Sequence, residues 1–479
     1  MTVAYLAYSD YRASDAAWAE RIPSHWRTAR LRYVAHVGNG TTPSRDRSDY
    51  WSNGTVPWLA SGQVNDYIVR QARQFITPMA QKDASLRLLP AGSVIVGLYG
   101  QGKTRGTAAY LCVEATINQA LAGITPGEEL DGRYLHYMLI AGRDYLRNEG
   151  RGGGQPNLNC AIVGSFLTLL PPRPEQDQIV AYLRAQDAHI ARFIQAKRDL
   201  IKLLTEQKQT IIEGAVTQGL DAATEKRDSD IDWLIQIPAH WKTCKLKHVA
   251  MFNPSRSEST AFRLSDVSVS FLPMECITTD GKLQRVENRK ASEVWEGYTY
   301  FRRNDVVMAK ITPCFENGKG GLLDTLPTEI GFGTTEFIVL RAAERRIRPA
   351  FLAKLLSLKT FRVLGADAMT GAAGQQRVPL GFVKNFEIAL PPLDEQDLIL
   401  DALQTATAEQ DVAIERLRSE IALIREYRDR LIADVVTGQV DVRGWQPGPE
   451  DAVSDDDLAA LGEDEDAVSD AEEGDGEEN

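Results

Sequence analysis

The chain repeats itself, and this constrains its fold more than any other feature of the sequence. Residues 22–35, IPSHWRTARLRYVA, return as residues 237–250, IPAHWKTCKLKHVA, at an offset of 215. Further along the offset becomes 220, because Leu-Pro-Pro followed by Glu-Gln-Asp occurs within residues 170–177 and again within 390–397. Self-similarity at a fixed spacing indicates that one structural unit is used more than once. We therefore predict two similar halves followed by a tail.

Each half begins with a mixed pattern and ends in a long helical one. The mixed part contains short β-rich runs, such as residues 93–96 and 305–308, and one helical pattern, at 131–147 or 348–364. Short apolar runs predict strands, and apolar residues spaced by three and four predict a helix. The sequence therefore predicts an α+β fold in which two mixed α/β domains are separated by two long helices.

The long helical pattern places apolar residues at alternating spacings of three and four. Eight of the eleven positions in this register from 180 to 215 are apolar, and so are eight of the eleven equivalent positions from 400 to 435. Two seams in matched register predict a helix pair that packs as a coiled coil, either parallel or antiparallel. The alternative is that each helix packs on its own domain. A helix of about 40 residues is about 60 Å long and would hold two domains at a fixed separation.

Negative charge is concentrated at the end of the chain. Of the 66 acidic residues, 15 lie after residue 445, where there is no Lys or Arg, so the remaining 51 face 54 basic residues. We predict a disordered acidic tail and a body that can present basic surfaces to nucleic acid. The tail either keeps the protein soluble or competes with DNA for a basic groove. The predicted division of the chain is 1–172 for the first mixed domain, 173–220 for the first helix, 221–392 for the second domain, 393–444 for the second helix and 445–479 for the tail.

Composition excludes several classes of protein. No run of about 18 apolar residues exists, so we predict no membrane span. The first residues lack the basic start and apolar core of a signal peptide. The five cysteines are scattered without a CxxC pair, which is typical of a protein of the reducing cytoplasm.

One stretch matches the phosphate-binding P-loop. Residues 97–104, GLYGQGKT, fit the pattern GxxxxGK[ST]. A P-loop must open a helix, but residues 105–113 are typical of a strand, and the equivalent stretch 311–320 keeps only the Gly-Lys pair. We predict a strand–turn–strand with a basic tip, and a P-loop nucleotide hydrolase remains the alternative. Neither HExxH nor GxSxG occurs, and the six histidines lack metal-ligand spacing. We predict no catalytic and no metal-binding residue.

Several short motifs occur in a characteristic order. Two copies of Ile-Pro-x-His-Trp begin at residues 22 and 237, and a Leu-Pro-Pro-x-x-Glu-Gln run begins each long helix. The first half also has Gly-Thr-Thr-Pro-Ser at 40–44, Tyr50-Trp51 with Pro57-Trp58, and Gly-Gln-Pro-Asn-Leu-Asn at 154–159. Over residues 18–444 this layout resembles the specificity subunits of type I restriction-modification systems. The second half departs from it, with Gln-Gln-Arg-Val at 375–378, and the acidic tail is not part of the pattern.

The resemblance implies a non-catalytic, DNA-binding subunit of a phage-defence system. Each target-recognition domain would read one half of a bipartite sequence in double-stranded DNA. The helices would set the gap and dock two modification (methyltransferase) subunits, and restriction/translocase subunits would join the complex. The resemblance also implies that S-adenosylmethionine and ATP with Mg²⁺ bind to the partner subunits, and that this chain binds no cofactor. A coiled-coil scaffold without DNA binding is a further alternative.

The candidates for DNA contact are polar and basic residues in Gly-rich or turn segments, where a backbone approaches a ligand closely. Phosphates attract Lys and Arg, and base edges pair with Arg, Asn, Gln, Ser or Thr. In the first domain the candidates are Arg45, Arg47, Lys103, Thr104, Arg105, Arg151, Gln155 and Asn157. In the second domain they are Arg256, Lys310, Thr312, Lys319, Gln375, Gln376 and Arg377.

Overall fold

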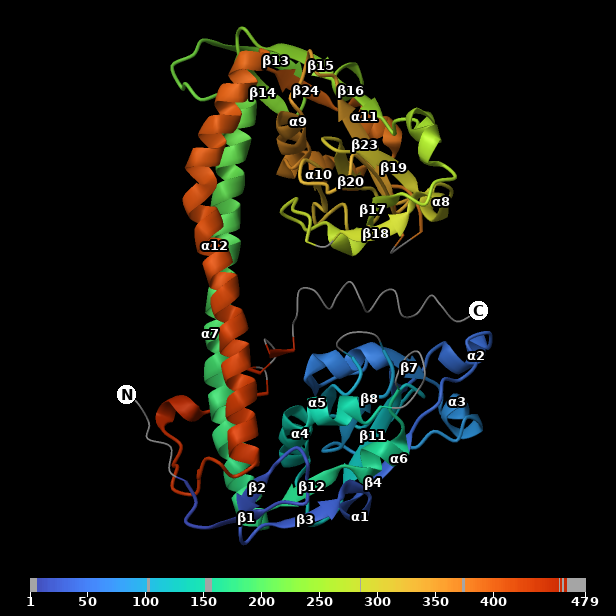
Figure 1. Cartoon of the computed structure of the whole chain (residues 1–479), viewed down its shortest axis with the longest axis vertical. Coiled ribbons are helices and arrows are strands. Elements are labelled where there is room, and N and C mark those ends of the chain that lie inside the picture. Colours follow the sequence, from blue (N-terminus) through green and yellow to red (C-terminus); the bar gives the residue numbers. More distant parts are fainter. Residues whose placement is uncertain are drawn as a thin grey trace. The chain divides into compact units, whose positions relative to one another are not determined.

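The structure is a computed structural model that describes residues 7–100, 104–150, 157–284, 286–372, 375–455, 457–458 and 461–462. The chain divides into two compact units. Unit 1 consists of Met1–Leu200 and Leu417–Asn479, and unit 2 consists of Ile201–Arg416. Each unit contains one mixed domain and part of both long helices, α7 (Arg173–Gln218) and α12 (Leu393–Val436) (Figure 1). The predicted α+β class is confirmed.

The mixed domain of unit 1 is built on a five-stranded sheet, whose strands in spatial order are β4 (Ala35–Asn39), β11 (Leu121–Pro126), β8 (Val94–Gly97), β9 (Ala108–Leu111) and β6 (Ile68–Val69). The pairs β4–β11, β11–β8 and β8–β9 are antiparallel, and β6 is parallel to β9. Side chains of a strand alternate between the two faces of its sheet. Val94 and Val96 of β8 therefore join the core that contains α4, whereas Ile95 joins a second core on the other face. Burial on both faces explains why this strand is a continuous apolar run.

The mixed domain of unit 2 contains two four-stranded sheets, whereas that of unit 1 has the five-stranded sheet and a three-stranded one. The first sheet of unit 2 consists of β16 (Ala250–Phe252), β23 (Phe337–Ala342), β20 (Val306–Ala309) and β21 (Gly320–Leu322), and the second of β18 (Glu287–Lys290), β17 (Ser268–Leu272), β22 (Ile330–Gly333) and β19 (Thr299–Arg302). Val306 and Met308 of β20 face one core, and Val307 faces another. The helices α9 and α10 pack on the first of these cores, to which Phe351, Leu355 and Phe361 contribute.

The remaining elements of unit 1 complete the domain. Its strands are β1 (Tyr11–Ala13), β2 (Arg21–Pro23), β3 (Arg27–Arg30), β4 (Ala35–Asn39), β5 (Val56–Leu59), β6 (Ile68–Val69), β7 (Gln74–Ile76), β8 (Val94–Gly97), β9 (Ala108–Leu111), β10 (Thr116–Ile117), β11 (Leu121–Pro126) and β12 (Leu167–Leu170). Its shorter helices are α1 (Leu31–Val34), α2 (Ser48–Trp51), η1 (Ser61–Asp66), α3 (Pro78–Asp83), α4 (Gly132–Ala141), α5 (Arg143–Asn148), α6 (Cys160–Ser165) and η5 (Pro449–Asp451).

Unit 2 has an equivalent set of elements. Its strands are β13 (Lys226–Ile231), β14 (Leu234–Pro238), β15 (Lys242–Lys245), β16 (Ala250–Phe252), β17 (Ser268–Leu272), β18 (Glu287–Lys290), β19 (Thr299–Arg302), β20 (Val306–Ala309), β21 (Gly320–Leu322), β22 (Ile330–Gly333), β23 (Phe337–Ala342) and β24 (Glu387–Leu390). Its shorter helices are η2 (Leu246–His248), η3 (Arg256–Phe262), η4 (Met274–Cys276), α8 (Ala291–Val294), α9 (Pro349–Leu356), α10 (Lys359–Asp367) and α11 (Leu380–Asn385).

The two long helices contact each other within each unit. Every one of the eleven predicted seam positions in α7, and every one in α12, is buried or half-buried. In unit 1 Asp187 pairs with Arg428 and Lys197 with Glu420, and in unit 2 Lys208 pairs with Asp411. Residue numbers rise along α7 as those of the partners fall along α12. The two pairs of unit 1 therefore show that the helices are antiparallel in that unit.

The stretch that matches a P-loop belongs to a hairpin. β8 pairs with β9 in antiparallel register, Val94 with Tyr110 and Val96 with Ala108. Residues 108–111, which follow the motif, form β9 and not a helix, so the P-loop alternative is wrong for a geometric reason. In unit 2 the equivalent strands β20 and β21 pair in the same way. The predicted strand–turn–strand is thus confirmed in both copies, although Lys103 lies outside the described residues.

The described part of the C-terminal region packs on unit 1, so the prediction of disorder from residue 445 onward is wrong for these residues. Asp455 forms ion pairs with Arg133 and Arg184 at 2.9 and 2.8 Å. Asp451 lies 2.8 Å from a ring nitrogen of His189. Leu458 is only 1% exposed and packs against Tyr67, Ile68 and Ala188. Counting charge alone misses this docking, because a few apolar residues are interspersed among the acidic ones.

We expect a chain that ends at Gly448 to lose about 2–3 kcal/mol of unfolding free energy in unit 1. The loss combines the exposure of the Leu458 site with partly exposed ion pairs of small individual value. Urea denaturation compares this chain with the full chain and with a control that ends at Gly462. We expect the control to match the full chain. Equal stability of all three would show that the contacts of Asp455 and Leu458 do not stabilise unit 1.

This effect is expected to depend on pH. Burial opposes the ionisation of Asp455, but the charge of Arg133 and its hydrogen bonds outweigh burial and lower the pKa of that carboxyl. A depressed carboxyl pKa stabilises the folded state above the ordinary value, and the stabilisation is lost as pH falls through the folded value. The difference between the two chains is therefore expected to shrink below about pH 4.

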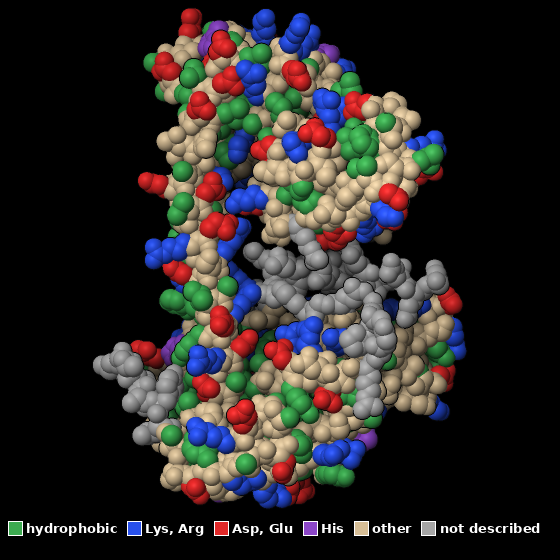
Figure 2. All heavy atoms as spheres, in the orientation of Figure 1, with side chains coloured by type: hydrophobic (Ala, Val, Ile, Leu, Met, Phe, Trp, Pro, Cys, Tyr) green, Lys and Arg blue, Asp and Glu red, His purple; other side chains and the backbone are tan. Residues whose placement is uncertain are grey.

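In the view of Figure 2, Lys and Arg side chains are interspersed with Asp and Glu over much of the described surface, and several Lys and Arg side chains lie close together along the long helices. No helix in the described part of the chain is both long and apolar enough to cross a bilayer. The five cysteines carry free thiols. Among the described residues, no group of three or more His, Cys, Asp or Glu side chains is placed to hold a metal ion.

Candidate nucleic-acid interface

In unit 1, several loops meet at the end of the five-stranded sheet where β8 ends. The Leu158 backbone N–H donates to the Leu98 carbonyl at 3.0 Å, which places Asn157 beside the β8–β9 turn that carries Thr104 and Arg105. The Leu98 N–H in turn donates to the Ala120 carbonyl. Three segments distant in sequence thus share one edge of the domain. The predicted residues Arg151 and Gln155 lie outside the described residues, as Lys103 does.

A fourth segment joins this edge. The Thr42 hydroxyl and the exposed Gln119 side chain are hydrogen-bonded at 2.5 Å, and the Thr41 N–H donates to the Ile117 carbonyl at 3.1 Å. An added side chain at Gly40 would collide with that same carbonyl, so this close approach requires glycine. The sequence did not point to Gln119 because this residue belongs to no motif.

The predicted residues Arg45 and Arg47 make different contacts. The Arg45 guanidinium lies 3.9 Å from the ring centre of Trp51 and donates to the Gln74 side chain. This stacking holds an exposed cation in a fixed orientation. Arg47 stacks on Tyr50 and forms a two-point ion pair with Asp49. The charge of Arg47 is therefore largely balanced within its own domain.

In unit 2, most of the predicted residues come together. Ile311 and Arg377 form an isolated β-bridge, the Thr312 N–H donates to the Gln376 carbonyl at 2.9 Å, and the Val378 N–H donates to the Lys310 carbonyl at 2.8 Å. The returning segment therefore meets the β20–β21 turn as it does in unit 1, although its sequence is different. Gln375 is exposed next to this bridge.

Glu336 sits among the basic residues of this edge and was not predicted. It accepts two hydrogen bonds from Arg377, at 2.9 and 3.0 Å, and lies 4.0 Å from the Lys310 ammonium. The hydrogen bonds of Arg377 are the main cause that lowers the Glu336 pKa. This carboxylate makes the edge of unit 2 less basic than a count of its Lys and Arg residues indicates.

Arg256 and Lys319 are the two other predicted residues of unit 2, and they make different contacts. The Arg256 guanidinium donates to the Trp295 carbonyl and is half-buried at the start of η3. Lys319 is half-buried in the β20–β21 turn, where its N–H donates to the Cys314 carbonyl.

The chain matches a family model described as the type I restriction modification DNA specificity domain, over residues 23–203 and 314–422. These two regions make up more than half of the chain. The chain belongs to this family.

Known members of the type I specificity family are similar to different parts of the chain. The EcoEI and EcoAI specificity subunits of Escherichia coli are both 38% identical, over 178 and 167 residues. These matches cover 36% and 34% of this chain but only 29% and 28% of those subunits. The MjaVIII specificity subunit of Methanocaldococcus jannaschii is 24% identical over 434 residues, which cover 88% of this chain and 95% of that subunit.

The fold is also similar to that of a solved chain from a study of complex assembly and conformational transition in the type I restriction-modification system. The TM-score is 0.50 and the identity is 15%, over 87% of this chain and 98% of that one. At this identity the likeness concerns the fold alone.

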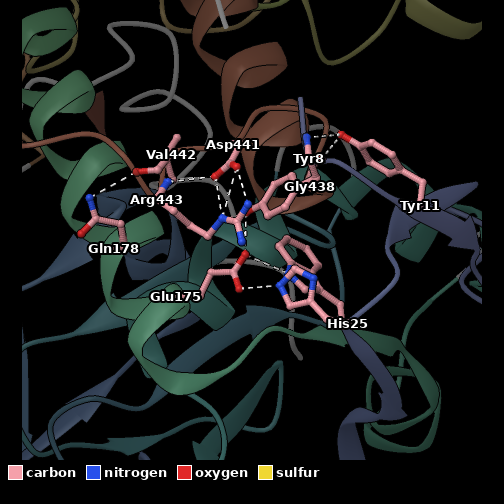
Figure 3. Close-up of polar contacts among 10 residues, drawn as sticks. Tyr8, Tyr11, His25, Glu175, Gln178, Gly438, Asp441, Val442 and Arg443 are labelled. Carbon is pink, nitrogen blue, oxygen red and sulfur yellow. Dashed lines mark hydrogen bonds and ion pairs between the residues drawn. The ribbon is translucent and has the colours of Figure 1, made fainter. Parts of the chain in front are cut away.

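The repeated motif of this specificity-domain chain anchors each long helix to its domain. In unit 1 the buried Glu175 of α7 accepts from the Tyr8 hydroxyl at 2.6 Å and from the Trp26 indole at 3.0 Å, and it lies 2.8 Å from the His25 ring (Figure 3). In unit 2 Glu395 of α12 contacts His240 and Trp241 in the same way. Both tryptophans are 1% exposed. Each tryptophan therefore packs in the core of its own unit.

In unit 1, Tyr8 and Arg443 add further contacts around Glu175. Tyr8 has no counterpart in unit 2, and its ring lies under the Arg443 guanidinium at 4.6 Å. Arg443 also pairs with Asp441 at 2.6 Å (Figure 3). Burial, assisted by the hydrogen bond to Glu175, raises the pKa of Tyr8 above its ordinary value. The hydroxyl therefore stays protonated and acts as a donor to the carboxylate.

Proposed function

We propose that this chain is the non-catalytic, sequence-specific DNA-binding subunit of a type I restriction-modification complex. In this proposal each mixed domain reads one half of a bipartite target in double-stranded DNA. The observation that carries it is the duplicated edge, where a hairpin turn meets a returning Gly- and Gln-containing segment, at Leu98 and Leu158 in unit 1 and at Ile311 and Arg377 in unit 2. Membership of the specificity family supports the same function.

The chemistry of the edges suits this role. Arg45 offers an oriented guanidinium, and Thr104, Asn157, Gln375 and Gln376 offer the short polar groups that pair with base edges. The two edges carry different side chains. Different residues in the same place are expected if the two halves of the target have different sequences.

The proposal also assigns a role to the long helices. We infer that they pair along their length as an antiparallel coiled coil that sets the gap between the half-sites, which the ion pairs in each unit support. In unit 1, exposed apolar side chains lie on both helices, Phe193 and Leu200 on α7 and Leu423 and Tyr427 on α12. Apolar side chains exposed on a paired helix favour docking of a further protein.

We propose that the docked proteins are two modification subunits, joined by restriction/translocase subunits. The S-adenosylmethionine needed for methyl transfer, and the ATP and Mg²⁺ needed for translocation, would bind to these partners. A cytoplasmic location follows from DNA as the ligand. The competing function, a scaffold that does not bind DNA, predicts that the chain and its partners together leave host DNA methylation unchanged.

The test is an exchange of one domain. We expect that replacing residues 22–170 by the first domain of another family member changes one half of the methylated motif and leaves the other half intact. Single-molecule sequencing of host DNA reads the motif in the wild type, in the exchange variant and in a strain without the gene. A motif that persists without the gene contradicts the proposed function. A motif that changes in both halves contradicts independent reading by the two domains.

A further inference from the structure

One arginine occupies the same place in both units and has not been assigned a role. Arg147 lies on α5 and Arg362 on α10, at the repeat offset of 215. Each directly follows a core residue, Leu146 or Phe361, that is 1% exposed. The backbone at each arginine is therefore fixed by packing.

Each arginine side chain lies across the turn of the adjoining hairpin. Gly106 and Gly318, two residues before β9 and β21, have φ angles of +74° and +76°. A Cβ added at Gly106 would lie 2.8 Å from Cγ of Arg147, and one added at Gly318 would lie 2.5 Å from Nη1 of Arg362. A side chain at either position would force the arginine to shift, and the positive φ angles also favour glycine. The same glycine–arginine contact is thus built twice.

The two guanidinium groups lack the partners that other half-buried arginines of this chain have. Arg341, for example, pairs with both Asp305 and Glu258. Across the described residues, by contrast, no side-chain hydrogen bond or ion pair of Arg147 or Arg362 is present, and both residues are half-buried. Burial lowers the pKa of Arg362, and the more distant charge of Glu213 only partly opposes this. A half-buried guanidinium with no adjacent carboxylate favours an external anion.

We propose that Arg147 and Arg362 are equivalent phosphate contacts, each of which binds the DNA backbone of one half-site at the turn of its hairpin. This inference rests on the proposed DNA-binding function. The neighbouring turn residues differ between the copies, Thr104 and Arg105 in unit 1 and Glu316 and Asn317 in unit 2, whereas the arginine and the glycine are common to both. The phosphate backbone is the same in every sequence, and the bases are not. A shared residue therefore suits the backbone, and the residues that differ suit the bases.

The experiment measures binding of the full chain to a duplex of about 40 base pairs with a scrambled sequence, by fluorescence anisotropy over a series of KCl concentrations. Each phosphate contact contributes about 0.9 to the slope of log K against log salt concentration. We expect Arg147→Gln and Arg362→Gln each to reduce the slope by about 0.9, and the double variant by about 1.8. Affinity at about 0.1 M salt is expected to fall about 3- to 10-fold per substitution. Arg147→Lys and Arg362→Lys keep the charge and are expected to keep the slope.

The controls remove one positive charge from the opposite end of each sheet. Arg27 in unit 1 pairs with Glu129, and the exposed Arg345 in unit 2 follows β23 at the end far from the β20–β21 turn. Arg27→Gln and Arg345→Gln are expected to keep the wild-type slope. Melting temperatures establish that each variant is folded, and Arg147→Met and Arg362→Met, which keep the apolar stem, serve as second neutral variants.

The outcomes distinguish failure of the phosphate contacts from failure of the proposed function. Wild-type binding with unchanged slopes in the Gln and Met variants overturns the phosphate contacts and leaves the proposed function standing. Equal losses of slope in the control variants also overturn them, because a general effect of charge then explains the result. No binding by the wild type at any salt concentration overturns both the proposed function and this inference.

Discussion

Replacing Arg428 by methionine is expected to lower the free energy of unfolding of unit 1 by about 3–5 kcal/mol. Arg428 pairs with Asp187 at 2.7 Å, and Asp187 is 1% exposed. The Tyr67 and Tyr137 hydroxyls also donate to this carboxylate. In the variant without the guanidinium, the buried Asp187 carboxylate keeps only the two neutral tyrosine hydroxyls as hydrogen-bond donors. Removing one partner of a buried ion pair typically has a cost of this size.

A double variant distinguishes the buried charge from simple loss of packing. In Asp187→Asn with Arg428→Met, the amide oxygen still accepts from the two tyrosines and no charge remains. We expect this double variant to recover at least half of the loss seen in Arg428→Met. Urea denaturation measures all three proteins. A double variant less stable than Arg428→Met would contradict the view that an unpaired carboxylate causes the loss.

Replacing Glu175 by alanine is expected to cost about 3 kcal/mol, and replacing Glu395 by alanine clearly less. The internal repeat makes this a matched comparison. Glu175 is 7% exposed and is contacted by Tyr8, His25 and Trp26, whereas Glu395 is 26% exposed and, among the described residues, forms side-chain hydrogen bonds with His240 and Trp241 alone. Each buried donor left without an acceptor costs about 1–3 kcal/mol, and exposure reduces that cost.

Thermal and urea unfolding of the two alanine variants measure this difference. Tyr8→Phe is the natural companion, because it removes the one donor that unit 2 lacks. We expect Tyr8→Phe to bring the effect of Glu175→Ala closer to that of Glu395→Ala. Equal losses of unfolding free energy for the two alanine substitutions in the wild-type background would show that the hydrogen bond from Tyr8 to Glu175 adds no stability.

The parts of the fold that follow from local pattern were predictable. The seam register predicted which side chains of α7 and α12 are covered, and the repeat predicted that both copies of the P-loop-like stretch form hairpins. The segment predicted for the second helix runs to residue 444, whereas α12 itself ends at Val436, two residues before Gly438. Gly438 has a φ of +71°, which is typical of the residue that ends a helix.

The parts that depend on pairing between distant residues were not predictable. Asp187 and Arg428 look like isolated defects in two apolar seams, and only the antiparallel register brings them together. Glu336 belongs to no motif, yet it changes the charge of an edge that was predicted from Lys310 and Arg377. The docked C-terminal residues were missed because acidic composition conceals one buried leucine, Leu458.

The division of the chain between the units also has a consequence for synthesis. Unit 2 is a single uninterrupted stretch, Ile201–Arg416, whereas unit 1 needs both Met1–Leu200 and the segment that begins at Leu417. Because the ribosome makes the chain from its N-terminus, the domain that is translated first is completed last. Until Arg428 emerges from the ribosome, Asp187 lacks the arginine with which it pairs. Unit 1 therefore stays incompletely folded while unit 2 is being made. A nascent chain that has emerged as far as Arg416, but not yet as far as Arg428, therefore presents to chaperones one finished unit and one unfinished unit.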